Sequence, residues 1–330
     1  MGYEAWRGAL VAAVIGISGI GGPAMNQTEK TAEQWLLDAQ KALLSRRTQD
    51  AVDFATKAIE LKADFADAYR IRGRARQRLG KIDDAITDFS NAIKLKPDAE
   101  SRVMRGECYS SLDRHADAIT DFDAALALDP KLLIALHYRG RERFKAGNHK
   151  ESIADFDRMI EQEPSHENGC WERGLSRYFA GEFAKAQKSF EDYHKVGPDD
   201  TENDLWRMLS QAEVDGLSEA QKVLRTLHAK RGGVFPQLYE LYTGKIQPAE
   251  VLTRVAQATA ADAERREREF YTHLYIGMWF VANRDKPKAT DHLEKAVALR
   301  SADYMWYVAR AQLDRLRPSS ETKERREQFR

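Results

Sequence analysis

The 330-residue sequence lacks several features that define whole classes of protein. It has two cysteines, Cys108 and Cys170, which are too few for the disulfide framework of a small secreted domain. Lysine and arginine together number 52, as do aspartate and glutamate, so the formal net charge is zero. Because proteins bind phosphate backbones through a surplus of basic residues, this balance argues against nucleic acid as a partner.

The sequence also lacks the motifs of common catalytic and metal sites. Its eight histidines are scattered singly, without a His-Glu-x-x-His helix or the Cys/His spacing of a zinc site. No glycine-rich phosphate loop follows a strand pattern, because the glycines at residues 19–22 lie in an N-terminal apolar segment. The sequence therefore predicts no enzyme activity, no cofactor and no metal site.

The N-terminal segment differs from the rest of the chain. Residues 8–22 form a weakly polar to apolar run after Arg7, and Gly22, Pro23 and Ala24 supply the small residues that an export peptidase reads. A transmembrane helix needs about 20 apolar residues, more than this run has. We predict a cleavable signal peptide at residues 1–24 and an exported, periplasmic protein. The alternative is an uncleaved segment that anchors the protein in the inner membrane by residues 8–22.

A repeat of 33 residues dominates the remainder. Gly73, Ala85, Phe89, Ala92 and Pro97 recur as Gly106, Ala118, Phe122, Ala125 and Pro130. The small residues fall where two helices approach closely, and the apolar residues follow helical periodicity, so each copy predicts two antiparallel helices. One such pair cannot bury its apolar face alone, so the copies are expected to stack.

This pattern resembles the tetratricopeptide repeat. Copies begin near Ala32, Ala66, Ala99, Leu133 and Glu167, and a detached sixth copy begins near Phe270. The resemblance implies an all-α fold, a tetratricopeptide-repeat superhelix that forms an α-solenoid of antiparallel helix pairs. We expect five tandem repeats at residues 32–199, an irregular helical segment at 200–269, the sixth repeat at 270–303, a capping helix at 304–317 and a charged disordered tail at 318–330.

The repeat register also gives an interpretation of recurring charges. An arginine precedes the repeat glycine in four copies, at Arg72, Arg105, Arg139 and Arg173. An aspartate precedes the repeat phenylalanine in three, at Asp88, Asp121 and Asp155. We interpret these residues as a structural ladder of ion pairs in preference to a basic binding stripe.

The same register places the two cysteines apart. Cys108 and Cys170 fall in the first helices of the third and fifth repeats, and repeats contact only their neighbours. A disulfide needs Cα atoms within about 7 Å. We therefore expect two free thiols, buried as small apolar side chains.

In the tetratricopeptide family the concave groove is lined by set positions of each first helix. Those positions predict that a protein or peptide partner binds at Arg70, Arg74, Arg78, His137, Arg141, Phe144, Trp171, Leu175, Tyr178 and Phe179. The aromatic end is expected to receive apolar side chains, because aromatic residues and arginine are enriched at binding hot spots. The basic end is expected to orient an acidic segment or a chain terminus. The alternative is that Trp171 and Phe179 pack against the helices after Asp199.

A narrower resemblance appears in the second half. The stretches 198–206, 217–224, 239–246 and 269–277 are similar to the NlpI-type lipoproteins of bacterial envelopes. This resemblance implies a non-enzymatic adaptor, often dimeric, that presents murein hydrolases to an envelope protease. The sequence departs from that family in having no cysteine before Cys108 for a lipid to modify. The alternatives are a structural or glycan-contacting envelope component, or a cytoplasmic scaffold if the N-terminal segment is not a signal.

Overall fold

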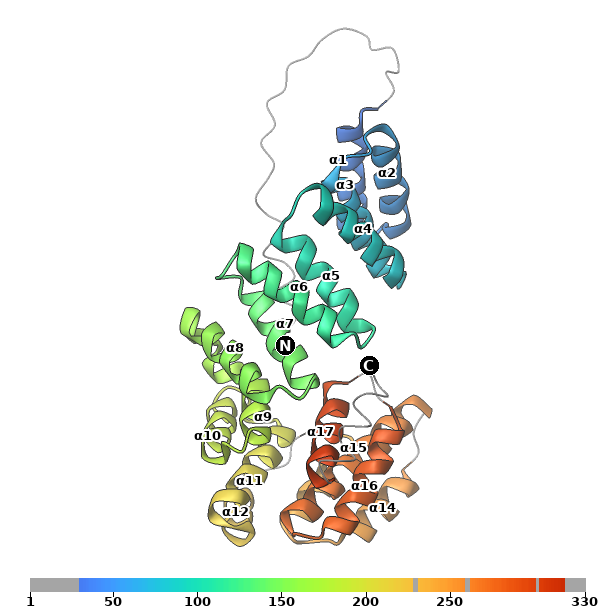
Figure 1. Ribbon diagram of the computed structural model, residues 1–330. Coiled ribbons are helices and arrows are strands. Elements are labelled where there is room, and N and C mark those ends of the chain that lie inside the picture. The colour runs from blue at the N-terminus through green and yellow to red at the C-terminus, as the bar shows by residue number, and fades with distance from the viewer. Residues whose placement is uncertain (1–29, 228–230, 259–261, 301–302, 318–330) are drawn as a thin grey trace.

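The computed structural model of the chain describes residues 30–227, 231–258, 262–300 and 303–317. The predicted signal peptide at 1–24 and the predicted tail at 318–330 lie outside these residues. Across the described ranges the chain forms helices and no β-strand. Consecutive helices pack as antiparallel pairs that wind from the N-terminal to the C-terminal end (Figure 1). The predicted all-α superhelix of helix pairs is therefore confirmed.

The five tandem pairs are α1 (Ala32–Leu44), α2 (Thr48–Leu61), α3 (Ala66–Arg78), α4 (Ile82–Leu95), α5 (Ala99–Ser111), α6 (His115–Leu128), α7 (Leu133–Lys145), α8 (His149–Gln162), α9 (Trp171–Phe179) and α10 (Phe183–His194). A short 3-10 helix, η3 (Pro164–Gly169), precedes α9. The second half contains α11 (Thr201–Asp215), α12 (Leu217–Leu224), α13 (Phe235–Tyr242), α14 (Pro248–Gln257), α15 (Asp262–Ala282), α16 (Lys286–Ala298) and α17 (Tyr304–Leu316).

The glycine and phenylalanine of each repeat explain why the two helices of a pair lie so close. A Cβ atom added to Gly73 on α3 would lie 2.9 Å from the ring of Phe89 on α4, and one added to Gly106 would lie 2.7 Å from the ring of Phe122. Carbon atoms do not approach so closely without displacement, so these positions accept glycine alone. In the detached pair α15–α16, Gly277 lies in the same way against Leu293.

The predicted ladder of ion pairs is confirmed in three repeats. Arg72 contacts Asp88 at 2.8 Å, and Arg105 contacts Asp121 at 2.7 Å. In the next repeat the Nε atom of Arg139 donates to Asp155 at 3.0 Å. These carboxylates are buried, so the arginines neutralise charges inside the fold and do not form a free basic stripe.

Arg173 in the fifth repeat departs from this ladder. It contacts Asp157 at 3.1 Å and Glu167 at 2.6 Å. The reason lies in the sequence, because Ser189 stands before Phe190 where the other repeats have an aspartate.

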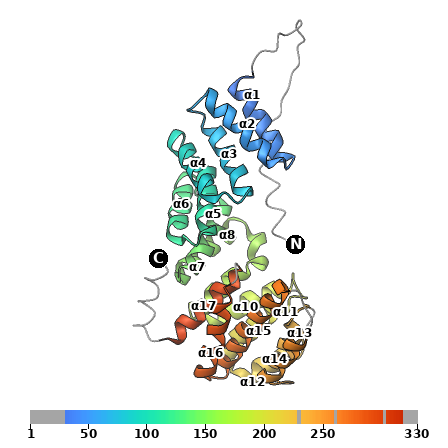
Figure 2. The same cartoon turned by 90° about the vertical axis from the view of Figure 1, so that its right-hand side faces the viewer.

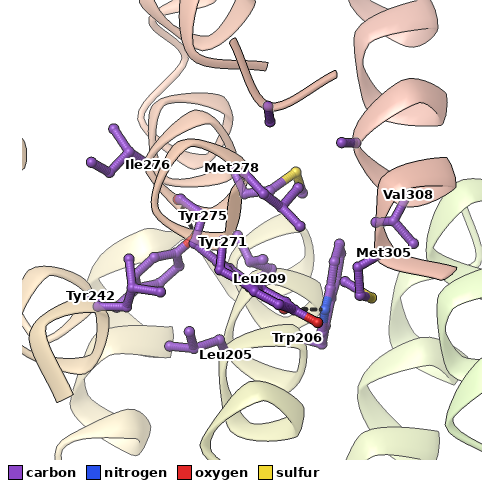
Figure 3. Close-up of a cluster of buried hydrophobic side chains, with 14 of the residues drawn as sticks. Leu205, Trp206, Leu209, Tyr242, Tyr271, Tyr275, Ile276, Met278, Met305 and Val308 are labelled. Atoms are coloured by element: carbon purple, nitrogen blue, oxygen red, sulfur yellow. Dashed lines mark hydrogen bonds between the residues drawn. The ribbon is translucent and has the colours of Figure 1, made fainter. Parts of the chain in front are cut away.

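A second core joins the fifth repeat to the irregular helices. Figure 3 shows the part of it that α11, α13, α15 and α17 contribute. Trp206 on α11 lies fully inside it, and its indole Nε1 donates to the hydroxyl of Tyr275 on α15 at 2.9 Å. Tyr242 on α13 donates to the main-chain oxygen of Tyr275 at 2.8 Å. Met305 and Val308 reach the same core from α17, as Figure 3 shows.

Helix α12, within the segment predicted to be irregular at 200–269, ends at Leu224. The chain turns there because the side chain of Arg225 donates to the main-chain oxygen of Thr243 at 3.0 Å, which holds it against the end of α13. Helices α11 and α13 lie in the same predicted segment, and α17 corresponds closely to the capping helix predicted at 304–317.

The last helix returns to the first half of the molecule. Figures 1 and 2 both show α17 between α16 and α7. Tyr304 stacks on Phe144 of α7 with ring centroids 5.2 Å apart, and Tyr307 donates from its hydroxyl to Asp113 between α5 and α6. The predicted capping helix therefore also packs back against the third and fourth repeats.

Candidate binding groove

The inner side of the array holds a groove of about 1120 Å³, which we call the large groove. Its walls are mainly the first helices α3, α5, α7 and α9 and the turns that precede them, and Met159 of α8 and Tyr193 of α10 complete the lining. Its apolar lining comes from Val103, Met104, Leu132, Leu133, Ile134 and Trp171. Ile134 and Trp171 remain partly exposed to solvent, so the apolar surface is accessible.

A second cavity of about 680 Å³, the small cavity, adjoins the large groove. Gln77, Glu107 and Tyr138 line both, so the two spaces meet at these side chains. On its other side the small cavity is bounded by Trp306 and Tyr307 of α17. Helix α17 therefore forms the end wall of the concave surface.

Negative charge predominates in the large groove. Four carboxylates line it, those of Glu100, Glu107, Asp129 and Glu172. Two arginines face them, Arg74 and Arg78, together with His137 and His166. The lining therefore has twice as many carboxylates as arginines.

The expected basic end of the groove is largely neutralised. Arg70 is held by ion pairs with Asp67 and with Glu100 of the next repeat. Glu100 also lies 4.0 Å from Arg74, and Arg78 donates to the main-chain oxygen of Leu43 at 2.8 Å. Glu100, one repeat further along, already lies against the guanidinium groups of Arg70 and Arg74. The structure therefore does not favour the acidic ligand that the sequence predicted for this end.

Glu172 is ionised although it is buried. Burial opposes its ionisation, but the hydrogen bond and charge of His137, 3.4 Å away, and the charge of Arg141 outweigh burial and lower the pKa of the carboxyl group. This carboxylate is therefore already paired within the protein.

Glu107 differs from the other three carboxylates. It lies on α5 at the junction of the large groove and the small cavity, partly exposed. Asp129 accepts the amide of Lys131 at 3.0 Å, whereas Glu107 has no hydrogen bond or ion pair with any residue that the structure describes. Among the groove's carboxylates, Glu107 and Asp129 therefore have no ion pair with a described residue, and only Glu107 lies at the junction with the small cavity.

A buried ionic cluster supports the wall next to α17. Glu142 accepts hydrogen bonds from Ser110 at 2.6 Å, from His115 at 2.7 Å and from Lys145 at 2.7 Å. Burial opposes the ionisation of Glu142, but these donors outweigh it and bring its pKa down to about 2. Tyr307 packs on this cluster, with its ring 5.3 Å from His115 and beneath the ammonium group of Lys145.

The structure divides the ten residues predicted to bind a partner. Those that line the large groove are Arg74, Arg78, His137 and Trp171, and Arg141 lines the small cavity. Arg70 lies beside the groove, where it forms ion pairs with Asp67 and Glu100. The side chains inside the core are Phe144, Leu175, Tyr178 and Phe179, with exposed fractions of 1%, 0%, 1% and 6%.

The burial of the expected aromatic end has two causes. Trp206 of α11 packs against Tyr178 and Phe179 at centroid distances of 5.4 and 6.3 Å, which is the alternative that the sequence left open for Phe179. Tyr304 of α17 covers Phe144 and meets Trp171 edge-on at 5.4 Å. These rings therefore stabilise the fold, and the accessible apolar surface lies nearer the N-terminal end.

Val103, Glu107 and Ile134 line the groove, although they were not among the ten residues predicted to bind a partner. Their signal was the repeat register, since they occupy the groove-lining positions of α5 and α7. The sequence indicated only weakly that α17 lines the concave surface. The indication was the pair of aromatic side chains, Tyr304 and Tyr307, one helical turn apart.

Both cysteines are free and buried, as expected. Cys170 borders the large groove, but burial raises the pKa of its thiol and disfavours the reactive thiolate. Among the residues placed in the structure, no three His, Cys, Asp or Glu side chains are grouped to hold a metal ion. None of the described helices combines the length and the apolar character needed to span a bilayer.

Comparisons with known proteins identify the repeat. Residues 72–132 match the family described as Tetratricopeptide repeat. The structure is similar to the C-terminal part of a TPR repeat-containing protein from Cytophaga hutchinsonii, with a TM-score of 0.50 and 20% identity over 83% of this chain and 98% of that one. A tetratricopeptide repeat protein from Parabacteroides merdae gives a TM-score of 0.51 and 15% identity over 86% of this chain and 98% of that one.

A sequence relative matches over a shorter stretch. Anaphase-promoting complex subunit 7 of Homo sapiens is 28% identical over 81 residues, which are 24% of this chain and 14% of that protein. The chain therefore matches only a small part of that protein's length. Together these similarities confirm the tetratricopeptide-repeat fold.

Proposed function

We propose that this tetratricopeptide repeat protein is a non-enzymatic adaptor, and that its large groove binds a peptide or a segment of another protein. The observation that carries the proposal is the groove itself, about 1120 Å³ of concave surface with apolar side chains at its centre and charged groups around them. Concave, mostly apolar surfaces with a few convergent polar groups are typical of binding sites. Partly exposed aromatic and aliphatic side chains such as Trp171 and Ile134 are the kind that supply most binding energy.

The walls of the groove favour binding because they are already in place. Adjacent helices are held by the glycine–phenylalanine contacts and by buried ion pairs such as Arg105 with Asp121. A partner therefore does not have to order the groove when it binds, which reduces the entropic cost of association.

We further propose that the protein works in a bacterial cell envelope. The support is the apolar run at residues 8–22 and the similarity of the second half to NlpI-type lipoproteins. On this proposal the partner is an envelope protease or a murein hydrolase, and the adaptor acts as a homodimer or as a monomer. Mass measurement of the mature chain from fractionated cells tests export, since an intact Met1 in the membrane fraction would contradict removal of residues 1–24.

Site-directed photo-crosslinking in intact cells tests the groove. A photoreactive amino acid replaces Ile134 in the groove, and in the control it replaces Leu128, which is 52% exposed at the end of α6. The proposal expects adducts with a defined protein from position 134 and few from position 128. Equal labelling from both positions, or adducts with glycan strands alone, would contradict a protein-binding groove.

A further inference from the structure

The contacts of helix α17 with the array are an example of the side chains that pack on the concave surface of this protein. This helix is a segment of the same chain that lies against α7 and α9, the helices that line the groove. Two kinds of contact join the end of the chain to the array. Aromatic rings of α17 pack on rings of α7 and α9, and Arg300, which precedes α17, contacts the carboxylate of Asp113 between α5 and α6.

The aromatic contacts come from two tyrosines. Tyr304 stacks on Phe144 at 5.2 Å and meets Trp171 edge-on at 5.4 Å. Tyr307 lies against the ionic cluster around Glu142. Next to them, Arg300 contacts the carboxylate of Asp113 at 3.3 Å, which also accepts the hydroxyl of Tyr307.

The large groove offers the same two elements without an occupant from this chain. Ile134, Val103 and the exposed part of Trp171 supply the apolar surface. Glu107 supplies a carboxylate that no described side chain neutralises. Glu100 and Glu172, in contrast, are already paired with Arg70 and His137.

From this correspondence we infer that the large groove selects peptide segments that place a lysine or arginine beside an aromatic or aliphatic side chain, with Glu107 receiving the cation. The inference rests on the proposed function and names its class of ligand. The partner is a basic-apolar segment of another protein, and the apolar side chain packs on Ile134 and Trp171.

Charge complementarity distinguishes this ligand from an acidic one. The groove has more carboxylates than arginines, and Arg74 already lies beside Glu100. An acidic segment would bring its carboxylates toward Glu107 and add to the excess of carboxylates over arginines in the large groove. A basic segment neutralises Glu107, and such complementarity sets specificity in interfaces of this kind.

Selection from a library of random displayed peptides on the full-length protein tests the inference. We expect the selected peptides to be rich in lysine or arginine next to aromatic or large aliphatic residues. A synthetic peptide of the selected consensus should bind about tenfold or more weakly to Glu107→Lys than to the unchanged protein, as expected for reversal of a charge-assisted contact. The matched control is Glu151→Lys, which makes the same charge change at an exposed position on α8 outside the groove.

The variant Ile134→Asp separates the two proposals. If the selected peptides bind Ile134→Asp as well as they bind the unchanged protein, the groove is not the binding site and the proposed function fails. If binding depends on Ile134 but the consensus is acidic or uncharged, the groove binds peptides and the inference about their charge is overturned. An equal effect of Glu107→Lys and Glu151→Lys also overturns it. Thermal unfolding of each variant checks that the comparison is made on folded protein.

Discussion

The hydroxyl of Tyr307 on α17 donates a hydrogen bond to the carboxylate of Asp113, 194 residues earlier in the third repeat. Arg300 contacts the second oxygen of the same carboxylate at 3.3 Å. Asp113 lies in the turn between α5 and α6 and has a positive φ of 58°, a conformation that aspartate tolerates better than most residues. One turn residue thus ties the end of the chain to the array.

Removing this tie should loosen α17. Tyr307→Phe keeps the ring on the Glu142 cluster and deletes only the hydroxyl, so we expect a loss of about 1 to 2 kcal/mol in the free energy of unfolding. Hydrogen exchange in α17 should become faster, because the helix then opens more often. Denaturant unfolding and exchange measured by mass spectrometry give the two values. In a double-mutant cycle with Asp113→Gly, which removes the acceptor and suits the positive φ, a combined loss smaller than the sum of the two single losses would show that the residues are coupled. Simple additivity would contradict the contact.

The repeat glycines should tolerate no side chain. Gly106→Val would place a Cβ atom 2.7 Å from the ring of Phe122 and force α5 and α6 apart. We expect a loss of about 1 to 3 kcal/mol of stability, as is usual for overpacking, and a comparable loss for Ala118→Leu at the same interface. The control is Gly169→Ala, because a Cβ atom there meets nothing within 4 Å. Thermal unfolding that is unchanged in both variants would mean that the repeat register is wrong.

The aromatic residues once expected to bind a partner should behave as core residues. Phe179→Ala removes a ring that is 6% exposed and packs on Trp206, so we expect a loss of about 3 to 5 kcal/mol of stability. Ile134→Ala, in the groove, should cost much less because this side chain is already partly exposed. Urea unfolding of the two variants measures the difference, and equal losses would argue against the assignment of Ile134 to the accessible surface.

Contacts between residues near in sequence could be predicted, and contacts between residues far apart could not. Gly106 and Phe122 are only 16 positions apart and recur with the repeat, so local periodicity was enough to predict their contact. The bounds of α17 were also predictable, because helical periodicity is local. Its position was not, because it depends on contacts between Tyr307 and a residue 194 positions away. The groove's charge was missed for a related reason, since Arg70 is paired with Glu100, 30 positions later in the next repeat.

The two cysteines should be unreactive in the folded protein. Burial raises the pKa of Cys108 to about 12, and it also raises that of Cys170. At neutral pH both therefore remain thiols, and a disulfide reagent that attacks thiolates should label neither until the protein unfolds. Spectroscopic titration with such a reagent, with and without denaturant, measures this. Rapid labelling of one thiol in the native protein would point to Cys170, which borders the large groove, and would mean that this part of the groove opens.

Glu142 should make stability depend on pH in the acid range. Its ordinary pKa of 4.5 falls to about 2 in the fold, so the folded protein keeps the carboxylate at a pH where the unfolded chain is protonated. The resulting stabilisation, about 3 kcal/mol, is complete above pH 4.5 and is lost as the pH falls from 4.5 to 2. The stability difference between the unchanged protein and Glu142→Gln should therefore shrink over that range.

The exposed residue Glu151 provides the control for this pH dependence. Glu151→Gln removes a carboxylate of the same kind outside the cluster, so its stability difference from the unchanged protein should stay nearly constant across the same range. A difference for Glu142→Gln that is equally flat would show that Ser110, His115 and Lys145 do not hold the carboxylate ionised in solution. In that case an ionised Glu142 would not support Tyr307, and α17 would be held by the hydrogen bond from Tyr307 to Asp113 and by its core packing, such as that of Tyr304 on Phe144.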